Sequence, residues 1–320
     1  MSEKVLVIGA GGQIGVELVL ALRAKYSNEQ VIASDIKDAH PLLKDGPFEH
    51  LDVMNADAVR ALVQKEKVTQ IYLLAAILSA TGEKNPLWAW DINMSSLLSI
   101  LDICVQEKVS KFYWPSSIAV FGPTTPMNET PQKTVIEPTT VYGISKYAGE
   151  LWCQYYHNKY GLDVRSIRYP GLISWKSAPG GGTTDYAIDI YIEALKTGKF
   201  TCFLSENTYL PMMYMDDAIR ATIELMDAPK ETLKNRMSYN LGGISFSPKE
   251  IAESIKKHIP EFTIDYAPDF RQAIADSWPN SIDDSASQTD WNWKHQYDLE
   301  AMTTTMLDNL KVKLTEEGQL

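Results

Sequence analysis

The first half of the chain alternates short apolar runs with amphipathic segments. The runs that predict buried strands are residues 5–8, 31–34, 71–75, 111–114 and 163–167. Segments 14–25 and 97–106 have the periodicity of helices. Strands that are apolar throughout and alternate with helices are typical of a parallel sheet covered on both faces. We therefore expect an α/β fold with a doubly wound parallel sheet.

The pattern becomes irregular beyond about residue 170. Helical periodicity returns at 216–226 and 248–258, short strands are expected within 200–209, and residues 177–184 read as a loop around three glycines. We expect residues 1–170 to form the first domain, to which later segments return. Residues 171–320 then form mainly a smaller, interleaved C-terminal lobe.

Composition narrows the partners. The 320 residues carry 30 Lys+Arg against 41 Asp+Glu, a net charge of -11, which disfavours nucleic acid and anionic membrane surfaces as partners. No apolar run approaches the ~18 residues of a membrane span. Cys104, Cys153 and Cys202 are widely separated and form no CxxC pair, as expected of small buried hydrophobes in a reducing compartment. We expect no metal site and a cytoplasmic location.

A glycine-rich turn directly follows the first predicted strand. Gly9, Gly12 and Gly15 are spaced G-x-x-G-x-x-G, and Gln13 and Ile14 open the following helix. Such a turn lets the backbone approach a pyrophosphate, and the helix N-terminus offers it free N–H groups. Asp35 lies 20 residues past Gly15, where a carboxylate accepts hydrogen bonds from a ribose and repels a 2′-phosphate. The spacing predicts a dinucleotide site that prefers NAD to NADP, although Lys37 could soften that preference.

A second motif carries the candidate chemistry. Tyr142 and Lys146 lie one turn apart on an amphipathic segment that runs to Tyr160. A lysine ammonium and the cationic oxidised nicotinamide would both lower the tyrosine pKa from about 10 toward neutrality. The phenolate could then take a hydroxyl proton while hydride leaves the same carbon. An ordinary surface pair of tyrosine and lysine is the competing interpretation.

The order and spacing of these motifs, with Ser116–Gly122 between them, resemble the extended short-chain dehydrogenase/reductases, of which UDP-galactose 4-epimerase is a familiar member. The resemblance implies that Ser117 holds the reacting oxygen against Tyr142 and that Asn93 supports Lys146 through water. It also implies that Asp52 lies at the adenine edge and that Ala75 and Ala76 let the cofactor pass. Its implied cofactor contacts further include Val53, Tyr142, Lys146, Tyr169 and Leu172. Leu73 stands where this family often has histidine.

The substrate motifs depart from those of sugar-nucleotide enzymes. Arg168–Trp175 lacks the asparagine and the terminal Gly-Pro of the usual R-x-x-N-x-[YF]-G-P. The segments 76–83, 179–186 and 276–279 instead resemble the short-chain type of L-threonine 3-dehydrogenases, along nearly the whole chain. That resemblance implies NAD-dependent oxidation of the 3-hydroxyl of L-threonine to 2-amino-3-oxobutyrate. The residues it places around the substrate are Ser79, Ser117, Tyr142, Gly182, Thr183, Thr184 and Trp278.

Two alternatives remain at this point. A sugar-nucleotide epimerase or dehydratase would use the same cofactor but recycle it. A non-catalytic NAD-sensing module would have no need of Ser117, Tyr142 and Lys146 together. Asp185 is the residue we consider for the substrate ammonium. By analogy with family members that pair through two long helices, we expect a homodimer.

Overall fold

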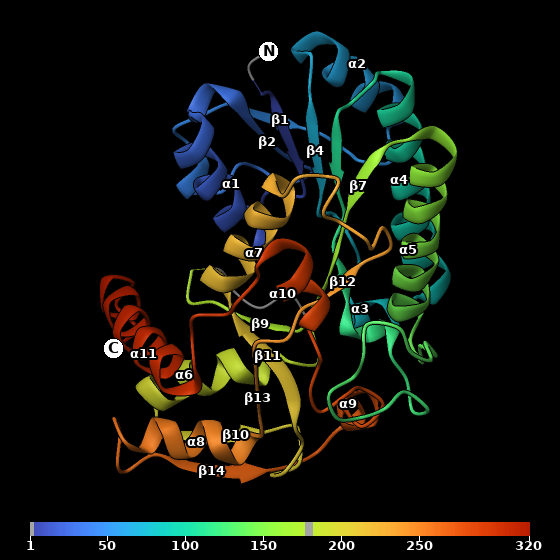
Figure 1. Ribbon diagram of the computed structural model, residues 1–320. Helices are drawn as coiled ribbons and strands as arrows, with labels where there is room; N and C mark the ends of the chain where they lie inside the picture. The colour runs from blue at the N-terminus through green and yellow to red at the C-terminus, as the bar shows by residue number, and fades with distance from the viewer. Residues whose placement is uncertain (1–2, 177–181) are drawn as a thin grey trace.

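A computed structural model describes residues 3–176 and 182–320 (Figure 1). Gly180 and Gly181, two of the three glycines in the predicted loop, lie outside the described residues. Within the described part, six parallel strands form the main sheet in the order β3-β2-β1-β4-β5-β7. Their bounds are β1 Val5–Ile8, β2 Val31–Asp35, β3 Phe48–His50, β4 Gln70–Leu73, β5 Lys111–Tyr113 and β7 Asp163–Arg165. The predicted parallel sheet is confirmed.

Helices cover both faces of this sheet (Figure 1). Alternate side chains of a strand point to opposite faces, so Val5 and Val7 join one apolar cluster and Leu6 and Ile8 join another. The first cluster includes side chains of α1 (Gln13–Tyr26) and α7 (Met215–Asp227). The second includes side chains of α2 (Ala56–Glu66), α4 (Pro86–Gln106) and α5 (Val141–Tyr160). The sheet is therefore doubly wound, as the apolar strands predicted.

Several predicted bounds were wrong. The strand expected at 163–167 is two strands, because β7 pairs with β5 whereas β8 (Ile167–Tyr169) pairs with β6 (Ser116–Ser117) and β12 (Tyr239–Asn240). The helix expected at 97–106 begins at Pro86, where the Asn85 side chain accepts a hydrogen bond from the Trp88 N–H and caps it. Only Lys199–Cys202 is a strand within the region expected to hold short strands.

The second lobe packs helices and short strands around its own core. Buried side chains of α6, α8 and α11, including Tyr186, Ile251, Met302 and Met306, form this core. The remaining elements are α3 Ser79–Gly82, β9 Gly171–Ile173, α6 Tyr186–Lys196, β10 Lys199–Cys202, β11 Leu210–Tyr214, β13 Ile244–Phe246, α8 Pro248–Lys256, β14 Thr263–Tyr266, α9 Phe270–Ala275, α10 Ser285–Trp291 and α11 Leu299–Glu316.

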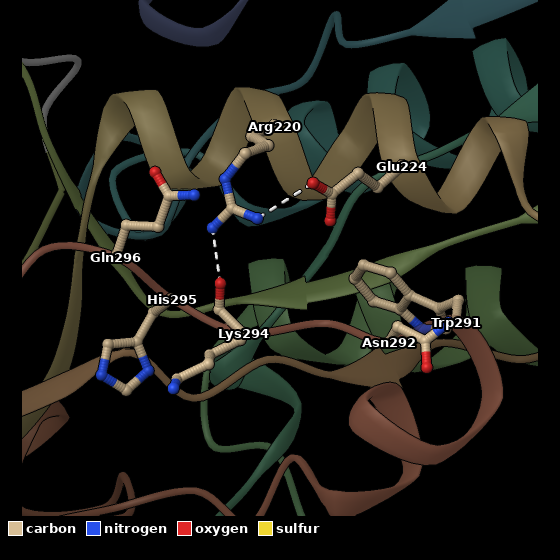
Figure 2. Close-up of a pocket in the computed structure, with 7 residues that line it drawn as sticks. All are labelled: Arg220, Glu224, Trp291, Asn292, Lys294, His295 and Gln296. Atoms are coloured by element: carbon tan, nitrogen blue, oxygen red, sulfur yellow. Dashed lines mark hydrogen bonds and ion pairs between the residues drawn. The ribbon is translucent and has the colours of Figure 1, made fainter.

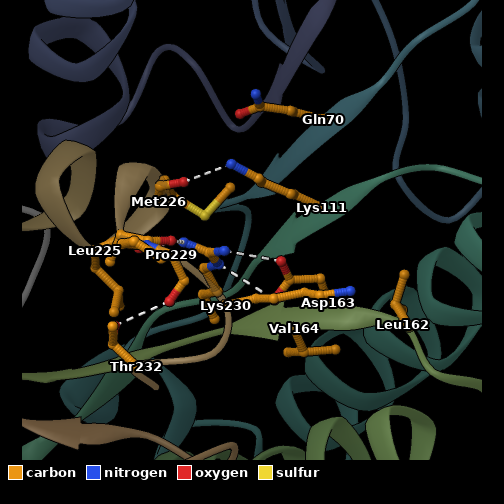
Figure 3. A network of polar contacts seen from close by, with 12 residues as sticks. Gln70, Lys111, Leu162, Asp163, Val164, Leu225, Met226, Pro229, Lys230 and Thr232 are labelled. Atoms are coloured by element: carbon orange, nitrogen blue, oxygen red, sulfur yellow. Dashed lines mark hydrogen bonds and ion pairs between the residues drawn. The ribbon is translucent and has the colours of Figure 1, made fainter. Parts of the chain in front are cut away.

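The C-terminal end of α7 is held by cations from the main sheet (Figure 3). Arg165 on β7 donates to the carbonyl oxygens of Leu225 and Ala228, at 2.6 and 2.7 Å. Lys111 on β5 donates to the carbonyl oxygen of Met226 at 2.8 Å. The last carbonyls of a helix have no partner within it, and positive charge is favourable there. These contacts dock α7 onto the sheet of the first half.

A segment near the C-terminus of the chain, around Lys294, returns to helix α7 at Arg220 (Figure 2). Arg220 on α7 donates to the carbonyl oxygen of Lys294 at 2.6 Å and to Glu224 at 2.9 Å. Its guanidinium lies 4.5 Å from the centre of the Trp293 ring. The chain after α10 is thereby fixed to α7, far from residue 170 in sequence. The domain boundary near residue 170 stays a prediction. Helix α7 and the chain after α10 both follow that boundary in sequence but pack with the first half of the chain.

All three cysteines are buried and free, which agrees with their prediction as small hydrophobes. Within residues 3–176 and 182–320, no helix combines the length and apolar character that crossing a membrane would require.

Candidate active site

A cleft of about 400 Å³ lies where the strand order of the main sheet reverses, at the carboxyl ends of β1, β4 and β5. Ligands of doubly wound sheets bind at this position. The second lobe supplies the opposite wall through Gly182–Asp185 and Trp278. The predicted site residues that line the cleft are Gly9, Gly12, Gln13, Ile14, Gly15, Ala76, Ser79, Ser117, Tyr142, Lys146, Tyr169, Leu172, Gly182, Thr183, Thr184 and Trp278.

Five predicted residues do not line it: Asp35, Asp52, Val53, Ala75 and Asn93. Sequence reasoning gave no role to other residues that do line it, namely Leu74, Ile77, Leu78, Thr81, Pro115, Ser116, Ile118, Pro170 and Gly171. Most of these directly follow a predicted strand or flank a predicted site residue. That position in the chain was the signal available for finding them.

The glycine turn has the shape that a pyrophosphate needs. A Cβ on Gly15 would lie 2.3 Å from the Gly9 carbonyl oxygen, and Gly9 itself has φ +88°. These two positions therefore need glycine for the protein's own packing. A Cβ on Gly12 would meet only that same oxygen, at 3.4 Å. Gly12 also precedes α1 without a side-chain cap, so the helix N-terminus is available to a phosphate. The turn fits a dinucleotide.

Asp35 ends β2 beside this turn. One carboxylate oxygen accepts a hydrogen bond from the Gly11 N–H at 2.9 Å, and the other accepts from the Lys37 N–H at 3.0 Å. The carboxylate therefore supports the glycine turn, and the Lys37 side chain lines the cleft. Asp52 is exposed and accepts from the Met54 N–H at 2.9 Å, while Val53 is buried. Their cofactor roles stay predictions.

Helix α5 brings Tyr142 and Lys146 to the cleft beside Ser117. Burial is the main influence on Tyr142 and raises its pKa to about 12, whereas a hydrogen bond with the Ser117 side chain lowers it. In the protein alone the loss of hydration therefore dominates, and the lowering toward neutrality expected with oxidised nicotinamide present stays a prediction. The positive charge of oxidised nicotinamide, which the expectation also invoked, acts only when the cofactor is bound.

Lys146 is itself almost fully buried. Its ammonium donates to the Pro115 carbonyl oxygen at 2.5 Å and lies 4.3 Å from the Trp114 ring centre and 5.5 Å from that of Tyr142. Burial lowers its pKa to about 7, while Cys153 and Glu150 act in the opposite direction. The Lys146 side chain can therefore gain or lose a proton near neutral pH.

Asn93 joins three elements behind the cleft. Its side chain exchanges hydrogen bonds with the backbone of Ile77, at 2.7 and 3.0 Å, and donates to the Ser145 hydroxyl at 3.2 Å. That hydroxyl donates to the Tyr142 carbonyl oxygen at 2.7 Å. Asn93 therefore steadies the first turns of α5. The water contact to Lys146 expected from the resemblance stays a prediction.

The wall from the second lobe offers polar groups to a small ligand. Among the described residues, the Thr183 hydroxyl and the Trp278 indole N–H are buried without a hydrogen-bond partner. Both residues line the cleft, and buried polar groups are usually paired. Asp185 also lines it and accepts from the Gly182 N–H at 2.8 Å. The cleft suits a small polar molecule between this wall and Tyr142.

Known proteins resemble the chain over nearly its full length. An uncharacterized epimerase/dehydratase of Staphylococcus haemolyticus is 49% identical, covering 97% of this chain and 98% of its own. A partial-consensus L-threonine 3-dehydrogenase is 58% identical with a TM-score of 0.95, covering 97% of this chain and 99% of its own.

Two further structures bear on the cofactor and on assembly. The holo form of a GalE-like L-threonine dehydrogenase from Cupriavidus necator is 56% identical with a TM-score of 0.93, covering 96% of this chain and 99% of its own. A monomeric L-threonine 3-dehydrogenase from a metagenome is 48% identical with a TM-score of 0.93, covering 97% of this chain and 99% of its own.

Residues 5–242 match the NAD dependent epimerase/dehydratase family. This segment contains the glycine turn, Ser117, Tyr142 and Lys146. It also contains α1, whose N-terminus lies at the cleft without a side-chain cap. The chain therefore belongs to the NAD-dependent epimerase/dehydratase family, the extended short-chain dehydrogenase/reductases, and is an oxidoreductase that uses NAD.

Proposed function

We propose that this enzyme oxidises the 3-hydroxyl of L-threonine to 2-amino-3-oxobutyrate and reduces NAD. The observation that carries the proposal is the identity of 58% and 56%, over nearly the whole chain, with two L-threonine dehydrogenases. The cleft supports it, because a small polar wall faces the tyrosine.

In this proposal Tyr142 is the general base. Bound NAD supplies the acceptor for the hydride that leaves C3 of threonine. Tyr142 takes the hydroxyl proton on its phenolate oxygen, and the Ser117 hydroxyl holds the reacting oxygen in place. Lys146 favours the phenolate when it carries its proton, since opposite charge stabilises the ionised form. A positioned base of this kind typically contributes ~10²–10⁴-fold to the rate.

The wall from the second lobe binds the rest of threonine. Thr183 and Thr184 of this wall, together with Ser79 of the first half of the chain, supply hydroxyls and backbone N–H groups that replace water around the carboxylate. Asp185 is the carboxylate that we assign to the substrate ammonium. The Trp278 ring bounds the pocket with an apolar surface. L-Serine should be a poorer substrate, because its missing methyl group gives up roughly 1–3 kcal/mol of contact.

A substrate panel tests this function. NADH absorbance is followed after mixing the enzyme and NAD with L-threonine, L-serine, L-allo-threonine or a UDP-sugar. We expect the fastest NADH formation with L-threonine and a ketone product in equal amount. Greater activity toward UDP-sugars would overturn the proposal in favour of an epimerase or dehydratase, the reaction named for the family. NAD binding without turnover of any alcohol would favour a sensing module.

The assembly and setting belong to the same proposal. Residues 1–170 bind NAD, residues 171–320 mainly bind the substrate, and the enzyme works in a reducing cytoplasm. A homodimer would cover the exposed apolar side chains of the long helices α4 and α5, which include Leu87, Trp88, Ile144, Leu151, Trp152 and Tyr155. The two helices pack side by side at one edge of the molecule (Figure 1).

A further inference from the structure

Three consecutive residues meet three successive turns of α5. The Pro115 carbonyl accepts from Lys146, the Ser117 side chain hydrogen-bonds Tyr142, and the Ser116 hydroxyl between them donates to Glu150 at 2.6 Å. Neighbouring side chains of a strand point to opposite sides. The Ser116 side chain therefore ties the two-residue strand β6 to Glu150, while the Ser117 side chain is directed to Tyr142.

Glu150 is a buried carboxylate that the proposed chemistry does not use. It is fully buried and paired with Arg168, which is 2% exposed. The Arg168 Nε and Nη2 donate to its two oxygens at 2.8 and 2.7 Å, a bidentate geometry that fixes direction as well as charge.

Arg168 is in turn fixed from the other side. Its Nη1 donates to the Asn240 side-chain oxygen at 3.0 Å and to the Gln132 carbonyl oxygen at 3.3 Å. Arg168 also lies opposite Ser116 in the pairing of β8 with β6. A buried ion pair contributes little net stability compared with apolar packing, but it specifies geometry when every partner is satisfied.

We propose that Glu150 is a positioning residue, which through Ser116 and Arg168 sets strand β6 against α5 and so holds the Ser117 hydroxyl toward Tyr142. The proposal rests on the proposed function for the choice of substrate. A displacement of about 1 Å at a reacting group can cost ~10²-fold in rate, so a small shift of β6 is enough to be measured.

Ser116→Ala tests the link, because it removes the donor to Glu150 and leaves the Glu150–Arg168 pair whole. Ser166→Ala is the matched control: Ser166 is equally buried, with 2% exposure, and its hydroxyl pairs with Ser238 at 2.6 Å. We expect both variants to melt at similar temperatures. Ser116→Ala should lower kcat for threonine about tenfold with KM for NAD within about twofold, and Ser166→Ala should keep kcat. A kcat for Ser116→Ala equal to that of Ser166→Ala would overturn the proposal.

Glu150→Gln adds a check of coupling. If it folds, it should lower kcat at least as much as Ser116→Ala does, because it also changes the pair with Arg168 and removes a charge that raises the Lys146 pKa. The double variant should lose little more than Glu150→Gln alone, since the contact that Ser116→Ala removes is then already altered. If the kcat of the double variant falls by the product of the two single losses, the Ser116–Glu150 link is contradicted. If Glu150→Gln does not fold, Ser116→Ala alone decides.

Hydrogen exchange separates this proposal from the proposed function. The Ala119 N–H donates to the Ser117 hydroxyl oxygen at 3.2 Å, so exchange at residues 116–120 reports on β6. Wild-type protein that forms no NADH from threonine would refute the proposed function. The exchange comparison then decides: faster exchange in Ser116→Ala than in Ser166→Ala supports positioning, and equal exchange refutes it.

Discussion

Burial lowers the pKa of Lys146, and this shift should make the stability of the protein depend on pH. Its folded pKa is about 7, below the value of about 10.4 expected in an unfolded chain. Between these values the unfolded chain binds the extra proton, so the free energy of unfolding should rise with pH from about 7 to 10. Lys146→Met should remove this contribution, which urea denaturation at several pH values would measure. Parallel stability curves for the two proteins would show that the lysine does not titrate in this range.

The base assignment is tested by a single oxygen atom. Tyr142→Phe keeps the ring that packs at the start of α5 and removes the hydroxyl that hydrogen-bonds the Ser117 side chain. We expect turnover to fall by ~10²–10⁴-fold while the Kd for NAD, measured by calorimetry, changes little. A variant that keeps more than about a tenth of wild-type turnover would rule out Tyr142 as the base.

Asp35 should set the choice between cofactors. Asp35→Ser removes its negative charge and the acceptor of the Gly11 N–H. We expect weaker use of NAD and a smaller gap to NADP, because the repulsion of a 2′-phosphate is lost. Asp38→Ser is the control, since it removes the same charge from an exposed site three residues after Asp35, beyond the end of β2. Equal ratios of NAD to NADP efficiency in both variants would reduce Asp35 to a turn residue.

At the scale of the element, we expect two glycines at the start of α1 to have different roles: Gly15 in packing, and Gly12 in binding the cofactor. Gly15→Ala puts a Cβ 2.3 Å from the Gly9 carbonyl oxygen, so we expect a lower melting temperature and lost NAD binding. Gly12→Ala meets that oxygen at 3.4 Å, an ordinary contact, so the fold should keep its melting temperature. The added methyl group should still weaken NAD binding by about tenfold or more, since it occupies the phosphate cradle. Unchanged NAD affinity in a folded Gly12→Ala would place the pyrophosphate elsewhere.

The elements also show how far the sequence could predict the fold. Apolar strands and the glycine turn depend on neighbours in sequence, so the parallel sheet and the motif residues could be predicted. The break after β7 depends on partners distant in sequence, at Ser116 and Tyr239, which no local pattern reveals. The first turns of α4 were not predicted, because Leu87 and Trp88 are apolar but exposed and so interrupt the helical pattern of apolar positions. The Ser116–Glu150 contact likewise appears only when β6 meets α5.

At the scale of the whole molecule, the exposed apolar side chains of α5 should decide assembly. Trp152 and Tyr155 are 40% and 44% exposed, and a charge placed between copies would be costly to bury. We expect a dimer by light scattering and a monomer for Trp152→Glu. Val312→Glu, at an exposed apolar position on α11, should leave the dimer intact. A monomeric wild-type protein, like the metagenome relative, would refute the homodimer.

The attachment of α7 and of the chain around Trp293 to the main sheet bears on how the protein is made. The apolar cluster under α1 is completed by Met215, Ala218, Trp291 and Trp293, which a ribosome adds long after the strands of the sheet. At 5–20 residues per second, the span from residue 170 to Trp293 takes roughly 6–25 s to synthesise. Throughout that interval the face of the nascent sheet that α1 covers lacks the rest of its apolar cover. The emerging chain should therefore engage chaperones that recognise exposed apolar strands until Trp293 has been translated.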